Sequence, residues 1–81
     1  MVSQCIPLAM VSPGEEVMVV DIRAGRGLTR RLTDMGLIPG TTIRVITSHV
    51  PGPILIDLRG SRLVLGHGVA QKVMVERKEN G

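Results

Sequence analysis

The residues best suited to recognising a partner are four arginines that lie close together in the sequence. Arg23, Arg26, Arg30 and Arg31 fall within nine residues that contain no acidic side chain. A guanidinium group can donate two parallel hydrogen bonds to one carboxylate, so this cluster is suited to docking an acidic protein surface. The alternative is an ordinary solvated face, on which Arg30 pairs with Asp34 four residues later for roughly a few tenths of a kcal/mol.

Three side chains could ligate a transition metal ion, but their spacing does not predict a site. Cys5, His49 and His67 are separated by long stretches, with none of the short ligand spacings typical of zinc sites. His49 beside a Pro-Gly turn and His67 between two glycines are more simply solvated loop residues, and Cys5 is more simply a small apolar residue near the terminus. We therefore predict no metal site and no cofactor.

Catalytic constellations are also missing from the sequence. The histidines have no accompanying pattern of acid and nucleophile, and Gly25-Arg26-Gly27 is too short for a glycine-rich phosphate loop. The aspartates are scattered and most simply keep the surface soluble: Asp21, Asp34 and Asp57. We predict no catalytic residue, and we do not expect an enzyme.

The composition narrows the range of partners further. The 81 residues include no Phe, Tyr or Trp, and the net charge is only +3. Single-strand nucleic-acid binding by small barrels and proline-rich peptide binding both rely on aromatic side chains, so both activities are disfavoured. The single cysteine cannot form an intramolecular disulfide, no basic residue precedes Arg23, and no apolar run has membrane-spanning length. We expect a soluble, unprocessed protein of the cytoplasm.

One short helix must position the arginine cluster. Leu28, Leu32 and Met35 recur at the helical period and predict a helix over Leu28 to Met35 with this stripe facing the core. Gly36 is placed to end the helix in the left-handed conformation, and Leu37 can supply the apolar contact of such a cap. Pro39-Gly40 predicts a turn into the next element.

The rest of the chain has the alternation of short strands. Gly60-Ser61 predicts a two-residue type II′ hairpin link, and the segment near Val69 has room for a single helical turn. The apolar segment 6–11 is a lead-in, and the polar tail 78–81 is expected to fray. We predict strands over about five segments: 15–23, which should be central, 42–47, 54–59, 62–65 and 72–77.

These elements predict one domain over residues 1–81, mainly β, in the form of a small antiparallel barrel. Closure would remove the exposed edges of an open sheet, and an SH3-like barrel fits five strands and one helix best. There is no room for the long crossover of a βαβ unit.

Three ordered motifs resemble the family of ferrous iron transport protein A, the FeoA family, over residues 6 to 76. They are Pro-Gly-Glu ahead of an aliphatic strand (13–22), Arg-Arg-Leu-Thr-Asp-Met-Gly-Leu-Ile-Pro-Gly (30–40), and Pro-Ile-Leu-Ile-Asp-Leu-Arg-Gly-Ser-Arg-Leu-Val-Leu followed by Ala70 and a Val-Met-Val strand. Gly66-His67-Gly68 departs from the family, which usually has charged, helix-forming residues there.

The resemblance implies an SH3-like fold and an accessory role in ferrous iron transport, beside a membrane ferrous-iron transporter that carries a cytoplasmic GTPase domain. It implies protein-protein interaction without nucleic-acid binding or membrane insertion, and family-level labels of transition-metal binding come with it. Two alternatives stay open: a nucleic-acid-binding barrel, and a metal-responsive regulator resembling the SH3-like domain of iron-dependent repressors.

Overall fold

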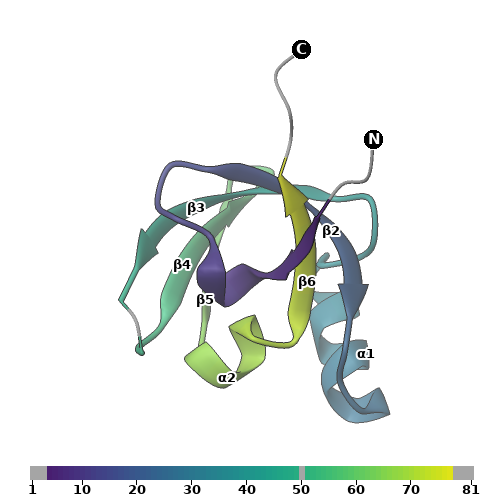
Figure 1. Ribbon diagram of the computed structural model, residues 1–81. Helices are drawn as coiled ribbons and strands as arrows, with labels where there is room; N and C mark the ends of the chain where they lie inside the picture. Colours follow the sequence, from purple (N-terminus) through teal and green to yellow (C-terminus); the bar gives the residue numbers. More distant parts are fainter. Residues whose placement is uncertain (1–3, 50, 78–81) are drawn as a thin grey trace.

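The protein is mainly antiparallel β-sheet with two short helices (Figure 1). The computed structural model describes residues 4–49 and 51–77, and the predicted frayed tail, 78–81, lies outside them. The elements in chain order are β1 (Cys5–Pro7), the 3₁₀ turn η1 (Leu8–Met10), β2 (Glu16–Ile22), α1 (Arg26–Asp34), β3 (Thr42–Ser48), β4 (Ile54–Leu58), β5 (Ser61–Leu65), α2 (His67–Ala70) and β6 (Val73–Arg77).

The strands form one six-stranded antiparallel sheet in the order β1-β6-β2-β3-β4-β5. The predicted central position of β2 is confirmed, since it pairs with both β6 and β3. Both β2–β6 and β3–β4 contain a register shift, at Val19/Asp21 and Val45/Thr47, and such bulges increase the local bend of a sheet. The sheet curves around one side-chain layer but is not closed: β1 and β5 remain edge strands within the described residues. The expectation that closure removes the edges was wrong.

The core is aliphatic throughout, as a chain without aromatic residues requires. Its fully buried side chains come from β2, β3, β4 and β6 and from the segments beside the helices, among them Leu8, Val17, Val19, Leu37, Ile43, Val45, Ile56, Val73 and Val75. The helices lie together at the lower end of the sheet in Figure 1, where Leu32 of α1 and Ala70 of α2 close the core.

The prediction of five strands missed β1. Cys5, Ile6 and Pro7 pair with Glu76, Val75 and Met74, and this partner strand lies at the far end of the sequence. Three residues that include a proline carry no local strand pattern, so only the tertiary pairing reveals the strand.

Helix α1 begins two residues before the predicted start and ends one residue before the predicted end. Gly25 is extended and its carbonyl accepts the first helical hydrogen bond from Thr29 N–H at 3.0 Å, so Arg26 and Gly27 belong to the first turn rather than to a connector. Met35 is the C-cap and is 41% exposed, so it does not continue the buried stripe.

The predicted helix end and turn are confirmed. Gly36 has φ 100° and donates to the Thr33 carbonyl at 2.9 Å, while Leu37 donates to the Leu32 carbonyl at 2.9 Å. These two bonds make a Schellman motif, which buries Leu37 where the stripe predicted Met35. Gly40 then has φ 95° in the turn that follows.

The link between β4 and β5 is shifted by one residue from the prediction. Leu58 pairs with Ser61, so the two linking residues are Arg59 and Gly60 rather than Gly60 and Ser61. Both have positive φ, 52° and 87°, which is the conformation of a type I′ turn and not of type II′. The Asp57 carboxylate fixes this turn by accepting the Gly60 N–H at 2.9 Å. The predicted antiparallel pairing of the two strands is confirmed.

The predicted helical turn near Val69 is confirmed as α2. Gly66 is its N-cap, and Ala70 N–H donates to the Gly66 carbonyl at 2.9 Å. The departure at Gly66-His67-Gly68 therefore does not prevent the turn.

Candidate functional site

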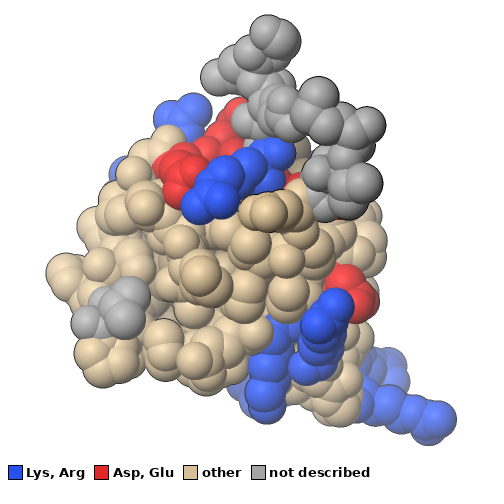
Figure 2. Space-filling model, viewed as in Figure 1, with Lys and Arg blue, Asp and Glu red and all other residues tan. Residues whose placement is uncertain are grey.

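All four arginines of the predicted cluster are exposed on or just before α1. Arg26 and Arg30 are four residues apart in the helix and so lie on one face, one turn from each other. Basic side chains gather at the lower end of the molecule in Figure 2, where α1 lies in Figure 1. We call Arg23, Arg26, Arg30 and Arg31 the arginine patch.

The arginine patch is not uniform in its surroundings. Arg23 Nε lies 3.9 Å from Asp21 Oδ2, and both side chains are more than half exposed, so this contact neutralises part of the charge and contributes little stability. Arg31 lies on the side of α1 that faces β5 and α2, beside Leu28 and Leu32.

The pair between Arg30 and Asp34 does not form. The described residues contain three ion pairs, Arg23–Asp21, Arg44–Glu16 and Arg77–Glu15, and neither member of the expected pair takes part. Both side chains are exposed, and an exposed pair gains too little to fix two long side chains in one geometry. Arg30 therefore presents its guanidinium to solvent or to a partner.

The candidate metal ligands do not come together. Cys5 is exposed on β1, and His49 is exposed after β3. His67 is half-buried at the start of α2, where its Nε2 lies 3.1 Å from Gln71 Nε2. Across residues 4–49 and 51–77, no three His, Cys, Asp or Glu side chains are grouped as a metal site needs.

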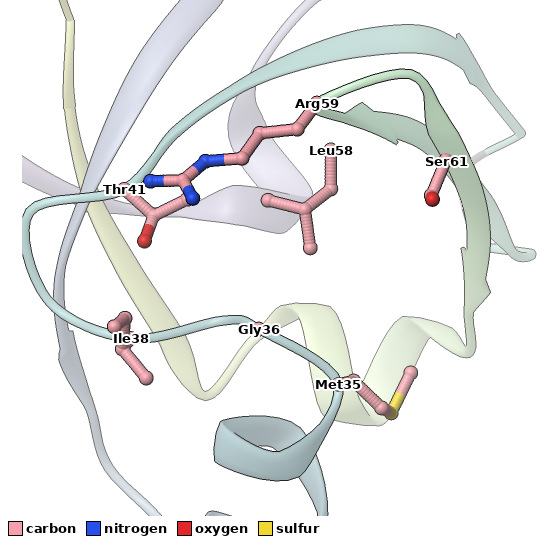
Figure 3. A pocket seen from close by; sticks show the side chains of 7 residues that line it. All are labelled: Met35, Gly36, Ile38, Thr41, Leu58, Arg59 and Ser61. Atoms are coloured by element: carbon pink, nitrogen blue, oxygen red, sulfur yellow. The ribbon is translucent and has the colours of Figure 1, made fainter.

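A cavity that the sequence did not predict lies between the end of α1 and the β4–β5 hairpin. Its volume is about 290 Å³, and we call it the hairpin notch (Figure 3). Its apolar lining comes from Met35, Ile38 and Leu58, its polar lining from Thr41, Arg59 and Ser61, and Gly36 completes it.

Two features of the backbone shape the hairpin notch. A Cβ on Gly36 would stand 3.0 Å from Leu58 Cδ2, so only glycine leaves this space free without displacing the leucine. Arg59 stands in the left-handed region at the type I′ turn, and Figure 3 shows its side chain extended across the notch toward Thr41.

A second, smaller depression runs beside the first. It encloses about 140 Å³ between α1, the end of β5 and α2, and Met35 borders both. Val64 on its rim is 66% exposed. Apolar surface therefore continues from the hairpin notch to Arg31 of the arginine patch.

Sequence reasoning missed Arg59 and Thr41 for different reasons. The one-residue error in the hairpin link made Arg59 a strand residue, although Asp57 three positions before Gly60 is a usable signal for the correct turn. Thr41 was only the residue after a turn, and its burial depends on packing between segments distant in sequence.

Among the described residues, the carboxyl with a shifted pKa is that of Glu15, at the end of the molecule opposite α1. Glu15 Oε1 accepts a hydrogen bond from Arg77 Nε at 2.7 Å, and Glu15 Oε2 accepts the Ser12 N–H at 2.8 Å. These bonds to the charged form, the Arg77 bond first, hold the pKa of Glu15 below its ordinary value. The pair ties the start of β2 to the end of β6 and has a structural role.

None of the helices in the described part of the chain is long and apolar enough to span a bilayer.

Comparison with known proteins connects this geometry to a family. A protein of Methanocaldococcus jannaschii named "Putative Fe(2+) transport protein A" is 44% identical over 75 residues, which make up 93% of this chain and 90% of that protein. The crystal structure of an iron uptake regulatory protein (FeoA) is 41% identical with a TM-score of 0.87, over 93% of this chain and 100% of that chain.

A manganese-dependent transcriptional repressor shares the fold alone. It is 20% identical with a TM-score of 0.86, and the match covers 96% of this chain but 44% of the repressor. The family model described as the FeoA domain matches residues 6–77. With this match and these relatives, the small SH3-like fold predicted from the sequence is confirmed, and the chain belongs to the FeoA domain family.

Proposed function

We propose that this chain is a cytoplasmic accessory protein of ferrous iron transport. It binds the cytoplasmic portion of a membrane ferrous-iron transporter that carries a GTPase domain, and it acts by this contact rather than by catalysis. Support for the link to iron comes from the family and from the 44% identical relative named for Fe(2+) transport.

The observation that carries the proposed contact is the arginine patch. Its four side chains are exposed on and beside one helix, and Arg26, Arg30 and Arg31 have no ion pair among the described residues. Unpaired guanidinium groups on a rigid helix are suited to carboxylates on a partner, because little ordering is needed when the bonds form.

The two alternative functions have weaker support. The chain has no aromatic side chain on which a base could stack, which disfavours a nucleic-acid-binding barrel. The likeness to the repressor is one of fold, and fold alone does not transfer an activity.

A pull-down from detergent-solubilised membranes tests the proposed partner. The tagged protein should recover a large membrane protein with a GTPase domain, identified by mass spectrometry. Recovery of nucleic acid or of a transcription complex instead would contradict the proposal.

Charge reversal tests the proposed surface. Arg30→Glu together with Arg31→Glu should weaken binding to the transporter's cytoplasmic portion at least tenfold, about 1.4 kcal/mol, while the melting temperature stays nearly unchanged. Binding by the unaltered protein should also fall with added salt, since exposed charges are screened over roughly 8 to 10 Å at physiological ionic strength.

Arg62 supplies the matched control, because it is an exposed arginine on β5 rather than on α1. Arg31→Glu alone should weaken binding more than Arg62→Glu alone, although both change the net charge equally. Equal effects would assign the interaction to overall charge, and unchanged affinity in the double variant would assign the arginine patch to ordinary solvation.

A further inference from the structure

Thr41 holds an unused hydrogen-bonding group at the hairpin notch. The residue is 4% exposed, and it is the buried polar residue among those that the structure describes. Its backbone is satisfied, because its N–H donates to the Ile38 carbonyl at 3.1 Å and its carbonyl accepts the Val19 N–H at 2.8 Å. Its hydroxyl takes part in no hydrogen bond with another described residue.

The hydroxyl is directed at the cavity. Figure 3 shows the Thr41 oxygen facing the space between the Arg59 guanidinium and Ile38. None of the buried side-chain polar atoms among the described residues lacks a hydrogen-bond partner, so the Thr41 oxygen is not sealed in the core but opens to the notch. A ligand that enters the hairpin notch can therefore replace water on this hydroxyl.

Arg59 supplies a positive charge at the same cavity. Its guanidinium has no ion pair among the described residues, and the nearest acid in the sequence, Asp57, uses its carboxylate to accept the Gly60 N–H. None of the described residues that line the hairpin notch is acidic. A carboxylate is therefore the complementary group, accepting from the guanidinium and from the Thr41 hydroxyl.

The other walls of the hairpin notch are apolar, so a ligand that fills it needs an apolar group next to its carboxylate. Met35 and Ile38 are 41% and 43% exposed, and Leu58 lines the notch from the end of β4. A free anion would leave these side chains in water, whereas an aliphatic side chain on the same ligand would cover them. The volume of about 290 Å³ suits one or two side chains of a polypeptide.

We propose that the hairpin notch binds a short acidic and aliphatic segment of a partner protein, with a Glu or Asp carboxylate on Arg59 and Thr41 and an adjacent Leu-like side chain against Met35 and Ile38. The segment belongs to the same partner that contacts the arginine patch, because Met35 continues the apolar surface toward Arg31. In that respect the inference rests on the proposed function, which it deepens by naming what the partner contributes.

A peptide titration followed by NMR tests the hairpin notch without the transporter. The probe is a blocked pentapeptide Gly-Leu-Glu-Leu-Gly, with Gly-Leu-Gln-Leu-Gly, Gly-Ser-Glu-Ser-Gly and sodium acetate as comparison ligands. The Leu-Glu peptide should shift the amide signals of Thr41 and Arg59 and the methyl signals of Met35 and Ile38. Each comparison ligand should bind at least tenfold more weakly.

Several results would overturn the inference. They are equal binding of the Gln peptide, equal binding of acetate, shifts centred elsewhere, and no shift at the highest soluble peptide concentration. Shifts of the notch signals on dilution without peptide would assign the cavity to a second copy of this chain instead.

Two variants remove the proposed donors while preserving the fold. Arg59→Asn removes the charge at a left-handed position that asparagine tolerates well, and Thr41→Val removes only the hydroxyl. Both should weaken binding of the Leu-Glu peptide at least tenfold, and Arg62→Gln, on the same hairpin but outside the notch, should not.

The same variants separate this inference from the proposed function. If the unaltered protein binds the transporter's cytoplasmic portion and Arg59→Asn and Thr41→Val bind equally well, the role of the notch is wrong while the proposed function stands. If the unaltered protein does not bind the transporter, the proposed function fails, and the peptide titration still decides whether the notch recognises this chemistry.

Discussion

Leu32 is the side chain through which α1 joins the core. It is 2% exposed, whereas Leu28 is only partly buried and Met35 is 41% exposed. Truncating a buried leucine removes its transfer free energy and leaves a cavity, so Leu32→Ala should reduce the free energy of unfolding by about 2 to 5 kcal/mol. Urea denaturation measures this directly. Met35→Ala is the control and should cost clearly less, and a loss under about 0.5 kcal/mol for Leu32→Ala would show that the helix packs differently.

The Thr41 hydroxyl should contribute to ligand binding but not to the stability of the fold. Its hydroxyl has no protein partner, so replacing it by a methyl group leaves no other group unpaired, and Thr41→Val should leave the free energy of unfolding unchanged or raised by up to about 1 kcal/mol. Thr41→Ser keeps the hydroxyl but deletes a buried methyl, and should lose about 1 kcal/mol. Thermal melts of both variants check this, and a clear loss in the valine variant would reveal a hydrogen bond within the fold.

Glu15 should make the stability of the fold depend on acid pH. Its folded pKa lies below the ordinary value of 4.5 because of the Arg77 and Ser12 hydrogen bonds. The contribution of ionised Glu15 to the free energy of unfolding is therefore fully present above the unfolded pKa, near 4.5. It is lost as the pH falls through the folded pKa. Since the Arg77 and Glu15 side chains are 50% and 31% exposed, we expect only about a few tenths of a kcal/mol.

Denaturation at a series of pH values measures this contribution. Glu15→Gln should reduce the fall in stability below pH 4.5. Asp34→Asn serves as the control, because Asp34 is exposed and takes part in none of the three ion pairs of the described residues. An unchanged slope in the Glu15 variant would mean that the pair has no energetic role.

Among the elements, the end of α1 depends most on a single residue. Gly36 has φ 100°, and an added Cβ would also stand 3.0 Å from Leu58 Cδ2. Gly36→Ala should therefore destabilise the domain by about 1 kcal/mol or more through left-handed strain and crowding. Gly27→Ala is a matched control, since Gly27 is within α1 and nothing stands within 4 Å of its added Cβ. Equal effects in chemical denaturation would contradict the role of the Schellman motif.

The elements themselves follow from the sequence to different degrees. The helix end, the Pro39-Gly40 turn and the strands β2 to β6 have local causes: a glycine cap, a turn pair and period-two alternation. The three-residue strand β1 has no local cause, because its pairing partner is β6. The hairpin link was misplaced because Arg59 takes a conformation that sequence rules reserve for Gly and Asn.

The candidate site shows the same division. The apolar positions of α1 face the core, so charged side chains on and just before this helix are expected to be exposed. The arginine patch could therefore be proposed from the sequence. The hairpin notch could not, because Met35, Thr41 and Arg59 come together only after the end of α1 packs against the hairpin. Long-range packing created the cavity, and the sequence alone carries no signal for it.

At the scale of the whole molecule, charge is concentrated although the net charge is small. The net charge is +3, yet the charged side chains at the lower end of the molecule in Figure 2 are mostly basic. An uneven distribution of this kind orients an approaching acidic partner before contact and makes the association rate sensitive to salt. The dissociation rate should instead reflect the apolar contacts of the hairpin notch.

The pairing of β1 with β6 also determines how this domain can be tethered. Cys5 lies opposite Glu76, so the described chain starts and finishes on neighbouring strands, while Ile22, which leads toward α1, lies opposite Val73 at the other end of β6. The start of β1 and the end of β6 therefore lie at the end of the sheet away from α1 (Figure 1). Fusion to a partner would make docking intramolecular, at an effective concentration in roughly the millimolar range for a short flexible linker. Under that arrangement even a contact of low intrinsic affinity would be occupied most of the time.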